Sequence, residues 1–410
     1  MPTLVGNVQE LLHEARGLND QVVALRRAIH REPEIGLELP LTQAKVLEAL
    51  QGLPLDLRTG KRTTSVVATL RGAAPGPTIL LRGDMDALPI QERSGVEFAS
   101  RFDGRMHACG HDAHTAMLVG AARLLSRHRA DLAGTIRFMF QPGEEGYHGA
   151  QVMLEEGVLD DPQVDAAFAL HATPRYAAGT IHTRAGPVLA SADTFTIHVS
   201  GRGGHASAPH LAADPIPVAC EIVIALQTFV TRSVHAFEPG VVTVGKIEAG
   251  TAENVIPASA SLTGTIRTVA PATRQLILDG IRRVARGIAE AHGVSADVHI
   301  DDGYPVTVNN ADVAQLVLEV GRQLLGDDGV QEQPFPQMAA EDFSYVLERV
   351  PGAMVSLGTR PRGMREGEAP AGHSDRYLLE EEALPVGVAM HAAIALEYAR
   401  RAEAPPARSG

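Results

Sequence analysis

The chain has 410 residues, of which 45% are hydrophobic and 21% are charged. This composition is typical of a folded globular protein and excludes a disordered or collagen-like one. Lys and Arg number 36 against 49 Asp and Glu, so the formal net charge is −13. Because a chain this acidic repels nucleic acid phosphates and anionic lipids, we expect neither as a partner. The length predicts two or three domains of ordinary size.

The chain also lacks the usual marks of export. No run of 18 uninterrupted apolar residues occurs, and the first residues have neither the basic nor the apolar segment of a secretory signal. Two cysteines cannot build a disulfide framework. We therefore expect a cytoplasmic protein of enzyme size without a membrane-spanning segment.

The first part of the chain alternates between strand-like and helical segments. Apolar residues recur with helical spacing over 8–25. The apolar run 78–84 is followed by a long Ala- and Leu-rich helical segment at 112–128, and strand-like runs enter turns at 134–146 and 164–174. Strand, helix and strand at this spacing predict an α/β fold with a mostly parallel sheet covered on both faces.

The pattern changes near residue 190. Segment 194–201 alternates apolar and polar residues, as a half-exposed strand does. Two helical runs and three more strand-like runs follow, in the β-α-β-β-α-β order of a ferredoxin-like module. After residue 302 the helix and strand pattern of the first part resumes. We therefore predict an α/β domain interrupted by an inserted ferredoxin-like α+β domain, with boundaries at 1–189, 190–302 and 303–410.

Five residues that bind transition metals stand at the ends of expected strands, at the start of the expected helix, or in a late loop. They are Cys109, His111, Glu145, His171 and His373. Ligands of an open parallel sheet collect at the carboxyl ends of its strands. Cys109 and His111 are two positions apart, so in extended backbone their side chains point the same way. Thiolate, imidazole and carboxylate together suit Zn, Co, Ni or Mn better than Mg or Ca.

Two adjacent carboxylates, Glu144 and Glu145, follow one of the expected strands. A solvated charge pair is the ordinary explanation, but at a strand end the repulsion calls for a cation or a proton. One carboxylate could bind metal while its neighbour accepts a proton from water, which would supply hydroxide near neutral pH. Asp86, at another strand end, could orient a ligand imidazole by accepting its free ring N–H.

The inserted segment contributes three further candidates. His205 lies in a Gly-rich run, and Asn254 and Arg267 follow it. The run lacks the Lys-Ser/Thr ending of a phosphate-binding loop, so we do not interpret it as one. Arg267 is equally consistent with pairing a carboxylate and with an exposed strand charge.

The motifs of the chain resemble one enzyme family in sequence and in order. They run from HREPEIGLELP through GDMDALP, MHACGHDAHTAMLVGAA, QPGEEG, GRGGHASAPH, GTAENVIP, GTIR and AEDFSY to AGHSDRY. This series is similar to that of the M20 metallopeptidase family, specifically its amidohydrolase branch of hippurate hydrolases, aminoacylases and indole-acetyl-amino-acid hydrolases. The resemblance implies a catalytic domain with a binuclear metal site and a smaller lid domain that also mediates dimerisation.

The resemblance also implies roles for single residues. Two divalent ions (Mn, Zn, Ni or Co) would be held by Cys109, His111, Glu145, His171 and His373. Glu144 would be the general base, and Asp86 would support the ligands from behind. His205 would stabilise the tetrahedral intermediate, often in the partner subunit's site. Asn254 and Arg267 would hold the substrate's carboxylate.

The chain departs from the family pattern at a few positions. Gly143 stands where Ala is common, Tyr147 and His148 stand where small residues are usual, and Asp375 stands where Pro is expected. None of these changes removes a ligand. Tyr147 and His148, with Pro187, are candidate walls of the acyl pocket, so they bear on acyl specificity.

We therefore expect a homodimer or higher homo-oligomer that hydrolyses the amide bond of N-acyl-L-amino acids, either hippurate-like or N-acetyl. A metallo-dipeptidase or carboxypeptidase on the same scaffold is the alternative, although no acidic residue for a free substrate amine is identifiable. A metal-free hydrolase using Cys109 and His111 is disfavoured, because residues two apart seldom form a nucleophile–base pair. A non-catalytic dimeric binding protein would leave the complete ligand set unexplained.

Overall fold

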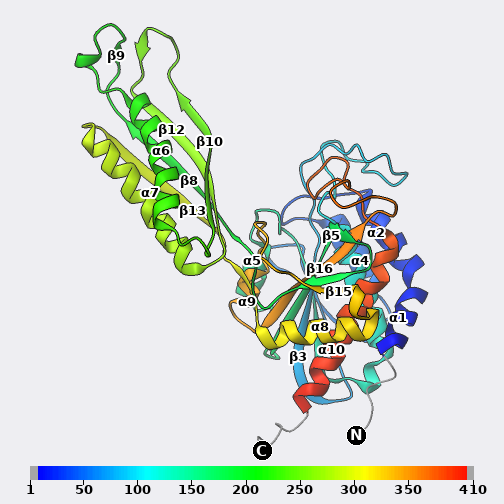
Figure 1. Cartoon of the computed structure of the whole chain (residues 1–410). Helices are drawn as coiled ribbons and strands as arrows, with labels where there is room; N and C mark the ends of the chain where they lie inside the picture. Colours follow the sequence, from blue (N-terminus) through cyan, green and yellow to red (C-terminus); the bar gives the residue numbers. More distant parts are fainter. Residues whose placement is uncertain (1–7, 404–410) are drawn as a thin grey trace, which may run out of the picture. The chain divides into compact units, whose positions relative to one another are not determined.

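The computed structural model describes residues 8–403 of the chain. These residues form two compact units (Figure 1). Within the described residues, the first unit comprises 8–186, 308–334 and 345–403, and the second comprises 187–307 and 335–344. The chain therefore passes between the two units four times.

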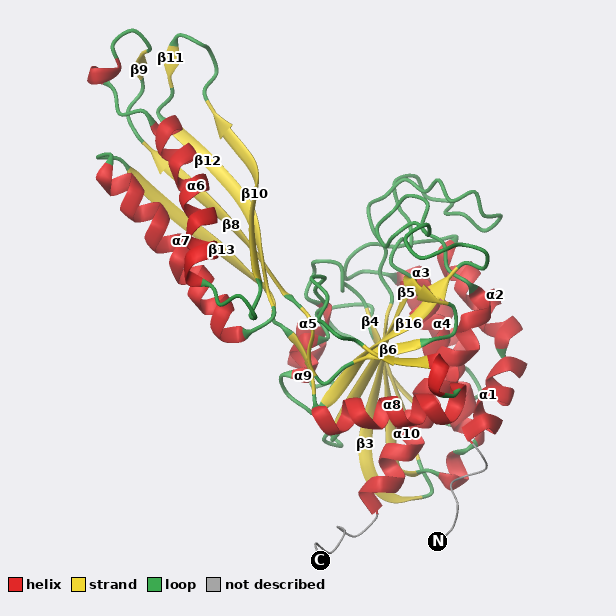
Figure 2. Ribbon diagram, viewed as in Figure 1, coloured by secondary structure: helices red, strands yellow, loops and turns green. Residues whose placement is uncertain are grey.

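The first unit is built on an eight-stranded sheet (Figure 2). Its strands lie in the order β1 (Asp56–Thr59), β2 (Val66–Arg71), β4 (Ala133–Gln141), β3 (Ala74–Asp84), β5 (Ala166–Ala177), β16 (Gly352–Arg360), β6 (Ile181–Thr183) and β15 (Val330–Glu332). The central strands β4, β3, β5 and β16 run parallel to one another, whereas β1 and β2 pair antiparallel at one edge. The prediction of a mostly parallel sheet is confirmed.

Helices of the first unit pack on this sheet and on one another. They are α1 (Val8–Gly17), α2 (Asn19–His30), α3 (Pro40–Leu50), α4 (His111–Arg127), α5 (Gly149–Glu155), α8 (Ala311–Leu325), α9 (Ser344–Leu347) and α10 (Leu384–Glu403). Helix α4 contacts β3 and lies against α2 and α10. Fourteen of its 17 residues are buried, including the polar residues His111, Asp112, His114 and Thr115 near its start. Gly120 permits this packing, because a Cβ there would lie 2.7 Å from Val388 and 2.9 Å from Val22.

The second unit has the ferredoxin-like element order. It contains β8 (Ser191–Ser200), α6 (Pro215–Ser233), β10 (Gly240–Ala249), β12 (Ser259–Thr268), α7 (Pro271–Ala291) and β13 (Ser295–Tyr304). The sheet order is β10-β12-β8-β13, with every neighbouring pair antiparallel. Phe195, Ile197 and Val199 alternate along β8 toward a core that α6 and α7 complete. The predicted inserted α+β fold is therefore confirmed.

Helix α6 is, within residues 8–403, the one helix long and apolar enough to cross a membrane by length and composition. Its buried residues Val218, Ile222, Leu226 and Phe229 recur at helical spacing and belong to the core of the second unit. A helix packed on a sheet requires such a stripe. The composition of α6 is thus weak evidence for a membrane span.

Candidate metal centre

Three parallel strands place the expected site residues at one edge of the sheet. Asp84 at the end of β3 is in register with Gln141 at the end of β4. Asp86 and the two glutamates at 144 and 145 follow these strands directly, and His171 lies on the neighbouring strand β5. Because parallel strands end at the same edge, residues far apart in the sequence come together here.

The first turn of α4 brings two more residues to this edge. Gly110 precedes the helix with φ +89°, a left-handed conformation that glycine adopts without steric cost. This turn lets Cys109 and His111 stand on the same side. His373 arrives from a late loop, where its backbone N–H donates to the carbonyl of Ala108 at 2.8 Å. The structure therefore gathers the five expected metal-binding residues in one place.

The ligand atoms lie close to one another. Three sets of residues have their ligand atoms within 4.8 Å of each other, namely Cys109 with His111 and His171, Cys109 with Glu145 and His373, and His111 with Glu144 and Glu145. Cys109 Sγ is 3.4 Å from His171 Nε2, and His373 Nε2 is 3.3 Å from Glu145 Oε1. Because the sets share members, the residues form one continuous cluster.

The chemistry of the cluster fits bound transition metal ions. Both ring nitrogens of His111 and Oε1 of Glu145 are buried without a hydrogen-bond partner. Leaving such groups unpaired costs about 1–3 kcal/mol each, and a divalent cation would satisfy them. A donor set of thiolate, imidazole and carboxylate suits Zn, Co, Ni or Mn. The residues present therefore fit the divalent ions that the resemblance implies.

The protonation state of His171 also suits metal binding. Burial lowers the pKa of His171 to about 3, so its ring is neutral, as a metal ligand must be. Its Nδ1–H donates to the carbonyl of Ala172 at 2.8 Å, which leaves Nε2 facing Cys109. Burial and the nearby Glu145 carboxylate raise the pKa of the Cys109 thiol to about 12. A nucleophilic cysteine needs a depressed pKa, so these surroundings argue against the metal-free cysteine mechanism.

Asp86 supports the pair of glutamates. Its Oδ1 accepts the backbone N–H of Glu144 at 2.9 Å, and its Oδ2 accepts that of Glu145 at 3.0 Å. The same Oδ1 lies 3.5 Å from Nδ1 of His111. Asp86 thus holds the glutamate turn through two hydrogen bonds and faces a ring nitrogen of His111, whose other nitrogen faces the cluster.

A buried ionic network holds the first turn of α4 from the other side. Asp112, next to His111, accepts from Arg26 Nε at 2.7 Å and from His30 Nδ1 at 2.8 Å. Burial opposes ionisation of Asp112, but Arg26 and His30 hold the pKa of this carboxyl far below its usual range. Arg26 also donates to Glu381 at 2.9 Å. The first turn of α4 is therefore tied to α2 and to the short turn at Glu381–Ala383 that precedes the last helix.

Sequence reasoning gave little weight to two buried residues of the site. Asp84 and His114 bond to each other, with Oδ1 of Asp84 2.6 Å from Nδ1 of His114. His114 stands three residues after His111 and so shares its face of the helix. This spacing beside a strand-end Asp is the signal that could have identified the pair.

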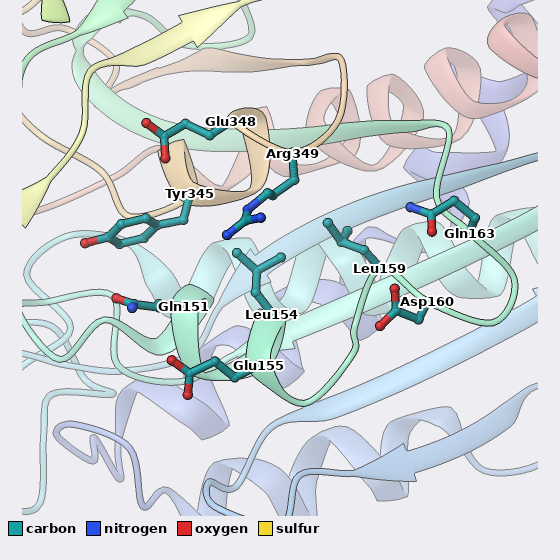
Figure 3. Close-up of a pocket in the computed structure, with 9 residues that line it drawn as sticks. All are labelled: Gln151, Leu154, Glu155, Leu159, Asp160, Gln163, Tyr345, Glu348 and Arg349. Carbon is teal, nitrogen blue, oxygen red and sulfur yellow. The ribbon is translucent and has the colours of Figure 1, made fainter.

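Two of the positions that depart from the family pattern, Gly143 and His148, have a left-handed backbone conformation. Gly143 has φ +71°, where any side chain is strained, and a Cβ there would lie 2.5 Å from Leu37 Cδ2, so alanine would also require this leucine to shift. His148 has φ +55°, and its Nδ1 is 3.0 Å from the Tyr345 hydroxyl. Tyr345 lines a pocket of about 580 Å³ between α5 and α9 (Figure 3). None of the expected metal ligands lines that pocket, so the pocket is separate from the cluster of expected metal ligands.

The second unit holds the three remaining candidates. His205 lies on β9 (Gly204–His205), which pairs with β11 (Val255–Ile256), and the Asn254 carbonyl accepts the N–H of Ala206 at 3.1 Å. His205 and Asn254 are therefore neighbours, and both are exposed. Arg267 lies near the far end of β12, in register with Ala192. Eight residues separate it from the start of that strand, a distance of roughly 26 Å.

Comparisons with known proteins agree with this site. Residues 80–397 match the family model described as Peptidase family M20/M25/M40. The chain is 37% identical over 398 residues to Thermostable carboxypeptidase 2 of Saccharolobus solfataricus, covering 96% of this chain and 99% of the relative. It is 38% identical over 382 residues to N-acetylcysteine deacetylase of Bacillus subtilis, covering 93% and 97%.

A solved structure is similar over nearly the whole chain. The YXEP protein of Bacillus subtilis, described as a dinuclear metal binding peptidase from the M20 family, superposes with a TM-score of 0.81 at 35% identity. The match covers 94% of this chain and 99% of that chain. The resemblance predicted from the motifs is thereby confirmed. The chain belongs to peptidase family M20/M25/M40 and is a metal-dependent, amide-hydrolysing enzyme.

Proposed function

We propose that the protein hydrolyses N-acyl-L-amino acids into a carboxylic acid and an amino acid, using two divalent transition metal ions. The observation that carries this proposal is the pair of Glu144 and Glu145, because both carboxylates have an oxygen within 4.8 Å of His111 and Glu145 also lies that close to Cys109 and His373. The relative named N-acetylcysteine deacetylase supports this substrate class. When bound, the ions would lower the pKa of a water molecule and polarise the acyl carbonyl.

Glu144 is the proposed general base. Its Oε2 is 3.9 Å from His111 Nε2, and its peptide N–H is held by Asp86. From this position the carboxylate would accept a proton from the attacking water and return it to the departing amine nitrogen. Glu145 would meanwhile remain a ligand, so the two adjacent carboxylates have different roles.

His205 is the proposed donor to the oxyanion of the tetrahedral intermediate. The backbone N–H of Ser207 lies 3.1 Å from Nδ1 of His205 and can only donate to it. Nδ1 is therefore the acceptor, and the proton of the neutral ring is on Nε2. An Nε2–H of this kind is the group that an oxyanion requires.

Asn254 and Arg267 are the proposed partners of the substrate carboxylate. Asn254 precedes β11 of the two-stranded β9–β11 sheet, whereas Arg267 lies on β12 of the four-stranded sheet, eight positions beyond the first residue of that strand. One small substrate therefore cannot touch both residues of a single copy. This separation supports a homo-oligomer in which two copies contribute to one site. The outer strand β10 supports it further, because it is an edge of its sheet and its Val241 and Ile247 are 45% and 52% exposed. Exposed edge strands readily pair with another chain.

Mixing two inactive variants tests the sharing of residues between subunits. Glu144→Gln and His205→Ala each inactivate the homo-oligomer if the assigned roles hold. A mixed dimer would contain one site with both Glu144 and a partner's His205, so co-refolded subunits should regain activity. No recovery, in mixtures shown by mass to contain hetero-oligomers, would place His205 in its own subunit's site. A monomeric mass for the wild-type protein in sedimentation would contradict the dimer.

The substrate class is tested with a panel of N-acetyl, N-benzoyl and indole-acetyl amino acids, together with dipeptides and peptides. The protein is first treated with a chelator, and Mn, Co, Ni or Zn is then added back. Amino acid release that returns only with metal, and from acyl amino acids before peptides, supports the proposal. Preference for peptides would favour the carboxypeptidase alternative, which the carboxypeptidase named among the relatives keeps open.

The cytoplasmic location stays a prediction from composition, to be tested by cell fractionation.

A further inference from the structure

His114 is buried beside the metal cluster, with only 1% of its surface exposed. Its ring centroid is 5.4 Å from that of His111 and 4.6 Å from that of His171. A histidine so placed among ligands has two possible roles, because it could bind an ion itself or it could hold a residue that does. The hydrogen bonds of its two ring nitrogens decide between these roles.

Both ring nitrogens of His114 are already used. The backbone N–H of Ala172 donates to Nε2 at 2.7 Å. A peptide N–H has no lone pair, so Nε2 must be the acceptor and the proton of the ring must be on Nδ1. That Nδ1–H donates to Asp84 Oδ1 at 2.6 Å. His114 therefore has no free lone pair for a metal ion, although Asp84, His111 and His114 lie as close together as a ligand set.

Ala172 connects His114 to a metal-binding residue. Its N–H is held by His114, and its carbonyl oxygen accepts the Nδ1–H of His171 at 2.8 Å. The carbonyl fixes which nitrogen of His171 carries the proton and how the ring is turned. The position of residue 172 therefore sets the direction of His171 Nε2, which lies 3.4 Å from Cys109 Sγ.

Asp84 is in turn fixed by its own neighbours. Its carboxylate pairs with Arg82, and neither side chain is exposed to solvent. Arg82 Nε donates to Gln141 Oε1 at 2.8 Å, and the Thr115 hydroxyl donates to the Asp84 carbonyl at 2.7 Å. A continuous hydrogen-bonded path thus leads from β4 through β3 and α4 to β5, where it ends at His171.

We propose that His114 is a positioning residue for the metal site, which acts through Ala172 to fix the orientation of the His171 imidazole. The proposal rests on the metal centre of the proposed function but not on its substrate. Groups that orient metal ligands typically change metal affinity by roughly 10–100-fold when they are removed. His114 therefore controls how tightly the site holds the ion bound by His171.

Two substitutions separate positioning from simple packing. His114→Leu removes both the acceptor for Ala172 and the donor to Asp84. His114→Gln retains one acceptor and one donor, so it can restore both contacts. His391→Leu is the matched control, because His391 is another buried histidine whose Nδ1 has no hydrogen-bond partner. Circular dichroism and the melting temperature of each metal-free variant show whether it is folded.

The measurement is cobalt titration of the folded metal-free proteins, followed by visible absorption and by competition with a chelator. We expect His114→Leu to weaken one of the two binding steps by roughly 10–100-fold and to change the absorption of that ion. His114→Gln and His391→Leu should bind both ions within a few-fold of wild type. Wild-type affinity for both ions in folded His114→Leu would overturn the proposal, as would equal weakening by His391→Leu.

A second measurement does not depend on the leucine variant folding. Ring-nitrogen NMR of histidine-labelled wild-type protein should show His114 with a proton on Nδ1 and none on Nε2, and His114→Gln identifies its signals by their loss. A proton on Nε2 would overturn the proposal. Both measurements are made without substrate. If the enzyme proves inactive on every N-acyl amino acid, the substrate proposal fails while the metal-binding result still decides the role of His114.

Discussion

The two units of the molecule hold their candidate site residues in opposite ways. In the first unit, His111 is buried, and its neighbours on both sides are fixed by hydrogen bonds and ion pairs. In the second unit, His205 and Asn254 are exposed, and His205 is held by a local contact to Ser207. A metal site must have its ligands in place beforehand, because misdirected ligands lose affinity. Residues that meet the substrate can instead be presented on an open surface and be completed by the substrate or by a second subunit.

The largest effect that this contrast predicts is at Glu144. Glu144→Gln removes the proton acceptor but keeps the size and shape of the side chain, so kcat should fall roughly 10²–10⁴-fold. Metal content, measured by elemental analysis after dialysis, should stay at the wild-type value, because Glu145 retains the ligand role. Full activity in a metal-loaded Glu144→Gln protein would remove Glu144 from the mechanism.

A somewhat smaller loss is expected in the second unit. His205→Ala removes the proposed oxyanion donor, which should lower kcat by about 10²–10³-fold. Both metal ions should bind as in wild type, since His205 is not among the ligands. Loss of metal by His205→Ala would contradict this division of roles between the two units, because an exposed residue of the second unit would then be needed for metal binding. His210→Ala, at a nearby exposed position, serves as the control and should remain active.

A substitution at Asp86 tests whether the buried site of the first unit depends on ligands that are held in place. Asp86→Asn keeps the shape of the side chain but leaves only one acceptor for two backbone N–H groups, those of Glu144 and Glu145. The glutamate turn should loosen, and metal affinity should fall about 10–100-fold. Chelator competition measures this loss. Excess metal should restore much of the activity, unlike in Glu144→Gln. Unchanged affinity would show that the turn holds its shape without Asp86.

The smallest effect concerns stability. Glu381 accepts from Arg26 and Arg27, and although burial opposes ionisation, these arginines lower the pKa of its carboxyl. A carboxyl with a depressed pKa stabilises the folded state above its unfolded pKa of about 4.3, and this contribution disappears as the pH falls through the folded value. Glu381→Gln should therefore cost about 1 kcal/mol at pH 7, and less below pH of about 4.

Urea unfolding at several pH values measures this difference. The exposed pair Lys246–Glu248 of the second unit is the matched comparison, and Lys246→Ala should change stability by less than about 0.5 kcal/mol. A cost of Glu381→Gln that stays constant with pH would mean that packing, and not charge, explains it.

The sequence indicated the positions of site residues that directly follow strands more reliably than the roles of buried residues such as His114. Strand ends suggested that Glu144, Glu145 and Asp86 lie near Cys109 and His111, and the structure brings these side chains together because neighbouring parallel strands end at one edge. The role of His114 could not be read in this way. Its partners, Asp84 and Ala172, are 30 and 58 residues away, and a buried histidine with satisfied nitrogens has the same sequence appearance as a ligand.

The inserted unit shows a similar limit. Its β-α-β-β-α-β order was evident from alternation and helix spacing. The separation of Asn254 from Arg267 was not, because it depends on the pairing register of β12 with β8. Motif order placed both residues beside a substrate carboxylate without indicating that Asn254 adjoins the small β9–β11 sheet while Arg267 lies near the far end of β12.

The four passages of the chain between the units limit how the enzyme can be divided into modules. The backbone N–H of Ala190, at the start of the second unit, lies within hydrogen-bonding distance of the carbonyls of Gln337 and Ala339, which lie in the short segment 335–344. A graft of residues 187–307 alone would leave that N–H without its partners. Recombination between relatives therefore has to exchange residues 187–307 and 335–344 together, because these two stretches form one folded unit.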